Sequence, residues 1–117
     1  MRIQIRGRDS PMTDGLQTHV ERRLAFALCR FGERIDRVTS RFSEVDGSSG
    51  AAQAQCYIHV GLRPDGSIEV EDTGTDRFVA VNGAADRASR SVARTLARER
   101  DGNDGRPRLV GNRKSRQ

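Results

Sequence analysis

The chain has 117 residues, of which 34% are hydrophobic and only 4% aromatic, so it can build one lean, aliphatic core. Its formal charge is +5 at pH 7, and 20 of its 21 basic residues are arginines. Such an excess of arginine favours an anionic partner. The sequence contains no apolar run long enough to span a membrane and no signal-peptide pattern, so we expect a cytoplasmic protein without a membrane partner.

Residues that commonly carry catalysis or bind metals are scattered along the chain. Cys29 and Cys56 lie outside any CxxC or CxxH spacing, which argues against zinc. His19 and His59 have no nucleophile motif nearby, and no glycine pattern matches a phosphate-binding loop. We therefore expect no enzyme, no metal, no cofactor and no small-molecule substrate. One group of acidic residues is better suited to capping a helix N-terminus: Glu69, Glu71, Asp72 and Asp76.

The first 47 residues predict a strand, a helix and a second strand. MRIQIRG alternates apolar and polar residues, as a half-buried strand does. A helix is expected from about Thr13 to Phe31, with Thr13 or Ser10 as its N-cap and Gly32 ending it in the left-handed conformation. Residues 35–47 then predict a strand. The apolar face of the helix consists of Leu16, Val20, Leu24, Ala27 and Phe31.

The next segments predict a hairpin. Residues 52–62, AQAQCYIHVGL, show the clearest period-two alternation in the chain. This alternation directs Cys56 toward the core and Tyr57 and His59 toward the opposite face. RPDG predicts a tight turn, and SIEVED resumes as the following strand.

A second helix is expected from Thr73 or Thr75 to about Arg100. Gly83 inside it predicts a close approach to the sheet or to the first helix, because glycine is otherwise costly in a helix interior. Residues 101–117 are polar, glycine-rich and basic, and we expect a disordered tail. The apolar stripe of this helix consists of Phe78, Val81, Ala85, Ala88, Val92 and Leu96.

The order of elements is therefore β-α-β-β-β-α. This order predicts an α+β fold, with two helices packed on one face of a four-stranded, mostly antiparallel sheet. We expect one domain over residues 1–100 and the tail over residues 101–117.

Four arginines of the second helix share one strip. With Val81 at zero on a helical wheel of about 100° per residue, they fall between about 180° and 260°, away from the core. A helix face stabilised by i,i+4 ion pairs would interleave glutamates here, but Asp86 and Glu99 lie off the strip. The four charges are thus expected to be uncompensated, which favours an anion-binding surface over a merely solvated one. The strip consists of Arg87, Arg90, Arg94 and Arg98.

The first helix and the tail add further basic residues that extend this electrostatic footprint toward a nucleic-acid backbone. Aromatic residues for stacking unpaired bases are nearly absent, since Tyr57 is the only tyrosine. The added residues are Arg22, Arg23, Arg30, Arg106, Arg108, Arg113, Lys114 and Arg116.

Two segments carry a resemblance to a known family. VEDTGTDRFVAVNGAADRASRSVARTLARER, over residues 70–100, has an acidic strand end, a turn with Asp, a small-residue helix start and then Asp-basic-x-x-Arg with another basic residue one turn on. The opening MRIQIRGRDSPMTDGLQTHVERRL is similar as well. Over roughly residues 1–100 the chain resembles the short form of the ribosome hibernation-promoting factors. These are small ribosome-associated translation inhibitors, also called sigma-factor modulation proteins.

The resemblance implies a protein that docks on the small ribosomal subunit and contacts ribosomal RNA with basic side chains of its helices. It further implies overlap with the messenger and tRNA sites, which silences ribosomes in stationary phase or stress. By position it identifies Arg23, Arg87, Arg90 and Arg94 as RNA-binding residues. Arg98 is added from the wheel alone, and Arg22 from its charge on the first helix. As a short-form member the chain is expected to lack the dimerising domain of the long form, so the resemblance implies a separate ribosome-dimerising factor as a further expected partner.

Phe26 departs from the family pattern, which commonly has a basic residue at this position of the first helix. Two alternative functions stay open. A double-stranded-RNA-binding-like module shares an α-β-β-β-α core, but the lysine cluster expected at the start of its last helix is missing. A regulatory protein-interaction domain would instead use Tyr57 and His59 on the exposed face of the sheet.

Overall fold

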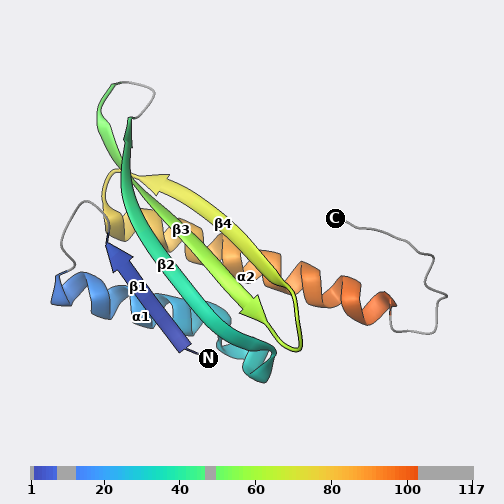
Figure 1. The fold of residues 1–117 in the computed structure, drawn as a ribbon. Coiled ribbons are helices and arrows are strands. Elements are labelled where there is room, and N and C mark those ends of the chain that lie inside the picture. Colours follow the sequence, from blue (N-terminus) through green and yellow to red (C-terminus); the bar gives the residue numbers. More distant parts are fainter. Residues whose placement is uncertain (1, 8–12, 47–49, 103–117) are drawn as a thin grey trace.

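The computed structural model describes residues 2–7, 13–46 and 50–102, which form two layers, a sheet and a pair of helices (Figure 1). Both helices lie on the same face of the sheet, as expected from the sequence. The elements in chain order are β1 (Arg2–Gly7), α1 (Asp14–Leu28), the 3-10 segment η1 (Cys29–Arg34), β2 (Ile35–Asp46), β3 (Ala52–Leu62), β4 (Ser67–Gly74) and α2 (Arg77–Gly102).

The four strands lie in the order β1-β2-β3-β4. β1 pairs with β2 in parallel, whereas β2 with β3 and β3 with β4 are antiparallel. The sheet is therefore mixed and mostly antiparallel. The parallel pair requires a crossover, which α1 and η1 supply between β1 and β2 (Figure 1).

α1 begins as expected and ends earlier than expected. Thr13 is its N-cap, because the Leu16 backbone N–H donates to Thr13 Oγ1 over 3.1 Å. The helix was expected to reach Phe31, but it ends at Leu28 and tightens into η1, which continues to Arg34. Gly32 does take a positive φ of 55°, yet its ψ of −127° lies outside the expected left-handed helical conformation.

α2 begins at Arg77, later than the expected Thr73 or Thr75. Thr73 instead continues β4, where it pairs with Gln55. The cap is supplied by Asp76, whose Oδ1 accepts a 2.9 Å hydrogen bond from the Val79 N–H. The helix also extends to Gly102, so two residues expected in the tail belong to it, and the rest of the tail lies outside the described residues.

The core lies between the sheet and the helices and is aliphatic, as the composition predicts. Cys56 is fully buried within it, which confirms its expected role as a small apolar residue. Phe78 was expected on the apolar stripe of α2, but it is 43% exposed, and its ring centroid lies 5.1 Å from that of His19 on α1. The largest fully buried side chains include Leu16, Val20, Leu24, Leu28, Ile35, Val38, Ile58, Val60, Val81 and Val92.

Gly83 marks the expected close approach of α2 to the sheet. A Cβ atom at this position would overlap the Asp72 carboxylate, which β4 directs toward the helices. The absence of a side chain on Gly83 therefore leaves room for Asp72, and this carboxylate lies next to the arginine strip.

Candidate nucleic-acid interface

The arginine strip of α2, residues Arg87, Arg90, Arg94 and Arg98, is exposed along its whole length. Ala85, Ala88 and Val92 on the opposite side of the helix are fully buried. The helical periodicity therefore predicted the direction of these four side chains correctly. A row of guanidinium groups at steps of three and four residues presents donors suited to phosphate oxygens.

The charges of the strip are not all uncompensated, and this expectation needs correction. Arg87 Nε lies 3.5 Å from Asp72 Oδ2, and both side chains are partly exposed. Among the described residues, Arg90, Arg94 and Arg98 form no ion pair and no side-chain hydrogen bond. The strip thus consists of three unpaired arginines and one that is paired with a strand. An exposed pair of this kind contributes at most about 1 kcal/mol, so a phosphate can replace it.

The carboxylates of α2 are used elsewhere, in contacts with the first helix and its extension. Arg23 Nη2 lies 2.5 Å from Asp86 Oδ1, and Arg34 Nη2 lies 2.5 Å from Glu99 Oε1. These cross-helix pairs explain why the acidic residues of α2 lie off the strip.

Arg23, a predicted RNA-binding residue, is therefore part of the helix–helix contact. Its side chain is only 22% exposed, and it also donates to the Asn82 carbonyl oxygen over 3.4 Å. Arg22, its neighbour, is exposed and has no ion-pair partner in the described part of the chain. On α1, the arginine available to a ligand is thus Arg22 rather than Arg23.

A polar seam joins α1 and the start of η1 to α2 along their solvent side. His19 Nε2 and Asn82 Oδ1 lie 2.9 Å apart, and Arg30 donates to Ser89 Oγ over 3.1 Å. We define the polar seam as these two pairs together with the pair of Arg23 and Asp86. Sequence reasoning missed it, although Asn82, Asp86 and Ser89 share a helical face beside the apolar stripe.

Phe26 borders a groove of about 280 Å³ next to the polar seam. Its side chain is 80% exposed, so the residue that departs from the family pattern faces the solvent. The groove is lined by Arg23, Phe26, Ala27, Arg30, Asp86 and Ser89.

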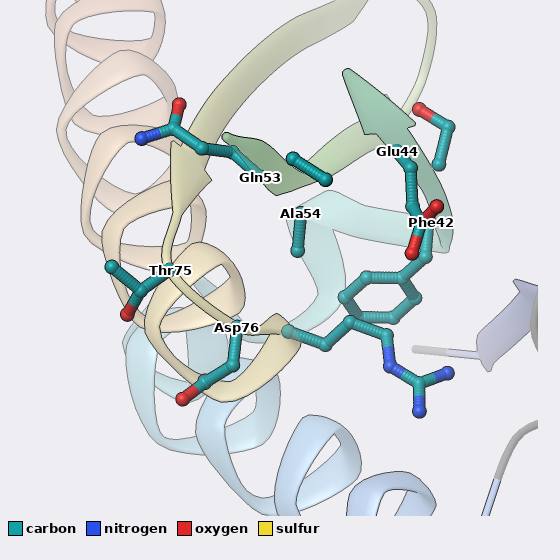
Figure 2. A pocket seen from close by; sticks show the side chains of 9 residues that line it. Phe42, Glu44, Gln53, Ala54, Thr75 and Asp76 are labelled. Carbon is teal, nitrogen blue, oxygen red and sulfur yellow. The ribbon is translucent and has the colours of Figure 1, made fainter. Parts of the chain in front are cut away.

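A second cavity, of about 250 Å³, lies where β2 and β3 approach the start of α2 (Figure 2). Phe42 and Ala54 line it together with Glu44 and Asp76, and Arg77 is the basic residue in its wall. The two carboxylates disfavour a phosphate there. This cavity is separate from the arginine strip.

The described residues contain no group of three or more His, Cys, Asp or Glu side chains that could hold a metal ion. No helix in the same ranges is long and apolar enough to cross a membrane.

The fold and the strip together define a class: small two-layer α+β proteins with an arginine-rich helical face suited to polyanions. The chain belongs to the family described as Sigma 54 modulation protein / S30EA ribosomal protein, which its sequence matches over residues 3–100. The family is ribosome-associated, and the membership confirms the resemblance inferred from the sequence. Comparison with curated protein sequences gives no match.

Solved structures show the same fold. A ribosomal subunit interface protein from Coxiella burnetii has a TM-score of 0.71 and 18% identity, and the likeness covers 83% of this chain and 99% of that one. The N-terminal domain of Thermus thermophilus Protein Y has a TM-score of 0.62 and 27% identity, covering 81% and 99% of the two chains. Both likenesses confirm the β-α-β-β-β-α architecture.

Proposed function

We propose that this chain binds the small ribosomal subunit through ribosomal RNA and thereby silences translation in the cytoplasm. In this proposal the bound protein occupies the sites of messenger RNA and tRNA, and it acts under stress or in stationary phase. Family membership supports association with the ribosome. The observation that carries RNA binding is the row of three exposed arginines, Arg90, Arg94 and Arg98, which have no ion-pair partner among the described residues.

The row has the properties of a backbone-binding surface. Its members are spaced by one helical turn, about 6 Å along the axis, so they can contact successive anionic groups without unwinding the helix. Arginines bound to phosphates release counterions, which makes the affinity fall as salt is raised. Arg87 joins the row when phosphate replaces Asp72, and Arg22 adds a charge from α1. Arg23 acts by holding the two helices together.

The proposal is tested by co-sedimentation with purified small subunits over a series of salt concentrations. The test variant is Arg90→Gln with Arg94→Gln. The charge-matched control is Ala51→Glu with Thr75→Glu, which changes two exposed residues near the turns and lowers the net charge equally. We expect the test variant to bind roughly 10- to 100-fold more weakly, with a salt slope smaller by about two, and the control to bind nearly as wild type.

Three results would contradict the proposal. Wild-type protein that stays at the top of the gradient in low salt would exclude ribosome binding. Equal weakening by test variant and control would show that only net charge matters. Tight binding to a naked RNA duplex with no preference for subunits would favour the double-stranded-RNA-binding alternative. A separate ribosome-dimerising factor, the other expected partner, would be detected by adding it to the wild-type complex and following the dimer peak.

A further inference from the structure

The open face of the sheet, on the side away from the helices, carries a second group of arginines. In the register of β1 with β2, Arg2 pairs with Arg37 and Arg6 pairs with Arg41. All four side chains are exposed, and they alternate with Ile3, Ile5, Val38 and Ser40, which face the helices. We call Arg2, Arg6, Arg37 and Arg41 the arginine block.

The block places like charges directly opposite one another in two cross-strand pairs. Such pairs are destabilising in a sheet unless another charge compensates them. Within the described ranges, the partner recorded for the block is an aromatic ring: the Arg41 guanidinium lies 4.4 Å from the centroid of Tyr57. Asp36, the nearest carboxylate in sequence, forms its ion pair with Arg63.

Carboxylates on the same face lie at its other side. Glu69 and Glu71 belong to β4, where they pair in register with His59 and Tyr57 of β3. β3 lies between β2 and β4, which are about 10 Å apart. Tyr57 of β3 interacts with both Arg41 and Glu69, and Arg41 and Glu71 line the same pocket, so these carboxylates lie nearest to Arg41, although they form no ion pair with it among the described residues. Glu71 also accepts a hydrogen bond from Gln55 over 3.2 Å. The open face is thus divided into a basic half on β1 and β2 and an acidic edge on β4.

The composition of the basic half suits a phosphate backbone rather than an apolar partner. Between the two arginine rows lie Gln4 and Thr39, which pair in register and are neutral and polar. The rows are four residues, or about 13 Å, apart along the strands, so the block offers guanidinium groups over an extended area. Guanidinium forks match phosphate oxygens in two hydrogen bonds each. The acidic edge on β4 repels the same ligand and confines it to β1 and β2.

From this geometry we propose that the arginine block is a second RNA-backbone-binding surface, on the opposite side of the protein from the α2 strip. This inference rests on the proposed RNA-binding function and adds to it. The sheet lies between the two surfaces, with the helices covering one of its faces only (Figure 1). A single short stretch of RNA contacting the strip does not reach the block. The bound protein is therefore held between two RNA segments.

The test uses a block variant that carries both Arg37→Gln and Arg41→Gln, two changes on β2. This variant is compared with the strip variant, which carries Arg90→Gln and Arg94→Gln, with a combined variant that carries all four changes, and with the charge-matched control. Binding to purified small subunits is measured over a salt series. We expect the block variant to bind roughly 10-fold more weakly than wild type, with a salt slope smaller by about two, and the combined variant to lose both contributions. A block variant with the affinity and slope of wild type would overturn the inference while leaving the strip result intact.

Two further measurements separate this inference from the proposed function. If wild-type protein fails to bind subunits, the proposed function fails, and naked ribosomal RNA at low salt then tests the block. Weaker binding of the block variant to that RNA supports the inference, and equal binding overturns it. Circular dichroism melting verifies that each variant is folded.

The alternative to RNA at the arginine block is a second copy of the chain, because the acidic edge of one copy could bind the arginine block of another. Sedimentation equilibrium of the protein alone distinguishes it. A wild-type dimer that the block variant abolishes would assign the block to self-association and overturn the RNA assignment. A monomer in both cases supports the RNA backbone as occupant.

Discussion

The contact between Gly83 and Asp72 allows a stability prediction that can be worked from the structure. A Cβ at residue 83 would overlap Asp72 Oδ2 and lie 3.0 Å from its Cγ, so Gly83→Ala forces the carboxylate to turn away. That carboxylate is held at both oxygens. Oδ1 accepts a 2.9 Å hydrogen bond from the Thr73 N–H, and Oδ2 lies 3.5 Å from Arg87 Nε.

Gly83→Ala changes the free energy of unfolding in two ways of similar size and opposite sign, through the higher helix propensity of alanine and through the lost contacts of Asp72. Alanine in a helix interior stabilises by about 1 kcal/mol relative to glycine. Losing the hydrogen bond to Thr73 costs about 1 kcal/mol, and losing an exposed ion pair costs up to about 1 kcal/mol more. Gly83→Ala in the wild-type background should therefore leave the free energy of unfolding unchanged or lower it by up to about 1 kcal/mol. In an Asp72→Ala background the same change should raise it by about 1 kcal/mol, because the Cβ atom of residue 72 lies at ordinary contact distance, 3.5 Å.

The assay is a double-mutant cycle with urea unfolding of the four proteins, in which a coupling free energy of about 1–2 kcal/mol is expected. Gly15→Ala is the matched control, because nothing lies within 4 Å of a Cβ at this position of α1. Its effect should be the same in both Asp72 backgrounds. A coupling below about 0.5 kcal/mol would refute the reasoning, since it would mean that Asp72 does not restrict residue 83.

Three further predictions concern the helix contact and the two cysteines. Arg23→Gln should lower the free energy of unfolding by about 1 kcal/mol through loss of the pair with Asp86, whereas Arg22→Gln should change it by less than about 0.5 kcal/mol. Thermal melting measures both effects, and equal effects would mean that the pair of Arg23 and Asp86 does not stabilise the helix contact. An alkylating reagent at pH 8 should modify the exposed Cys29 in the native protein and Cys56 only on unfolding, as peptide mass spectrometry can show. Burial raises the pKa of the Cys56 thiol from 9.0 to about 11, because the folded protein keeps the thiol neutral. The stability that depends on the neutral thiol, about 3 kcal/mol, is fully present below pH 9 and is lost as the pH rises through about 11. Alkaline unfolding should therefore be steeper in wild type than in Cys56→Ala, and identical pH profiles would contradict the assignment.

The sequence predicts those parts of the fold that depend on local periodicity. The alternation in residues 52–62 matches β3 at both ends, and the buried face of α1 from Leu16 to Ala27 is as expected. The errors occur where tertiary contacts outweigh local signals. Thr73 has the chemistry of a cap, but its pairing with Gln55 keeps it in β4 and leaves the cap to Asp76.

The candidate site was predictable only in part, for a related reason. The wheel gives the direction of Arg90, Arg94 and Arg98, because a helix determines which of its own residues share a face. It contains no information about Asp72, which approaches Arg87 from a strand. The arginine block was missed because it depends on the register between β1 and β2, two strands separated by a crossover.

The polar seam between α1 and α2 has a consequence for binding entropy. Its pairs join residues that advance in the same direction along α2 and along α1 with its continuation η1, from His19 with Asn82 to Arg30 with Ser89. Sliding one helix by a single turn, about 5.4 Å, would break every pair at once, so the seam fixes the axial position of one helix relative to the other. The basic side chains of the two helices are therefore held at a fixed separation before any ligand arrives. Under the proposed function, RNA would bind side chains whose separation is already fixed, so we expect little conformational entropy to be lost on association.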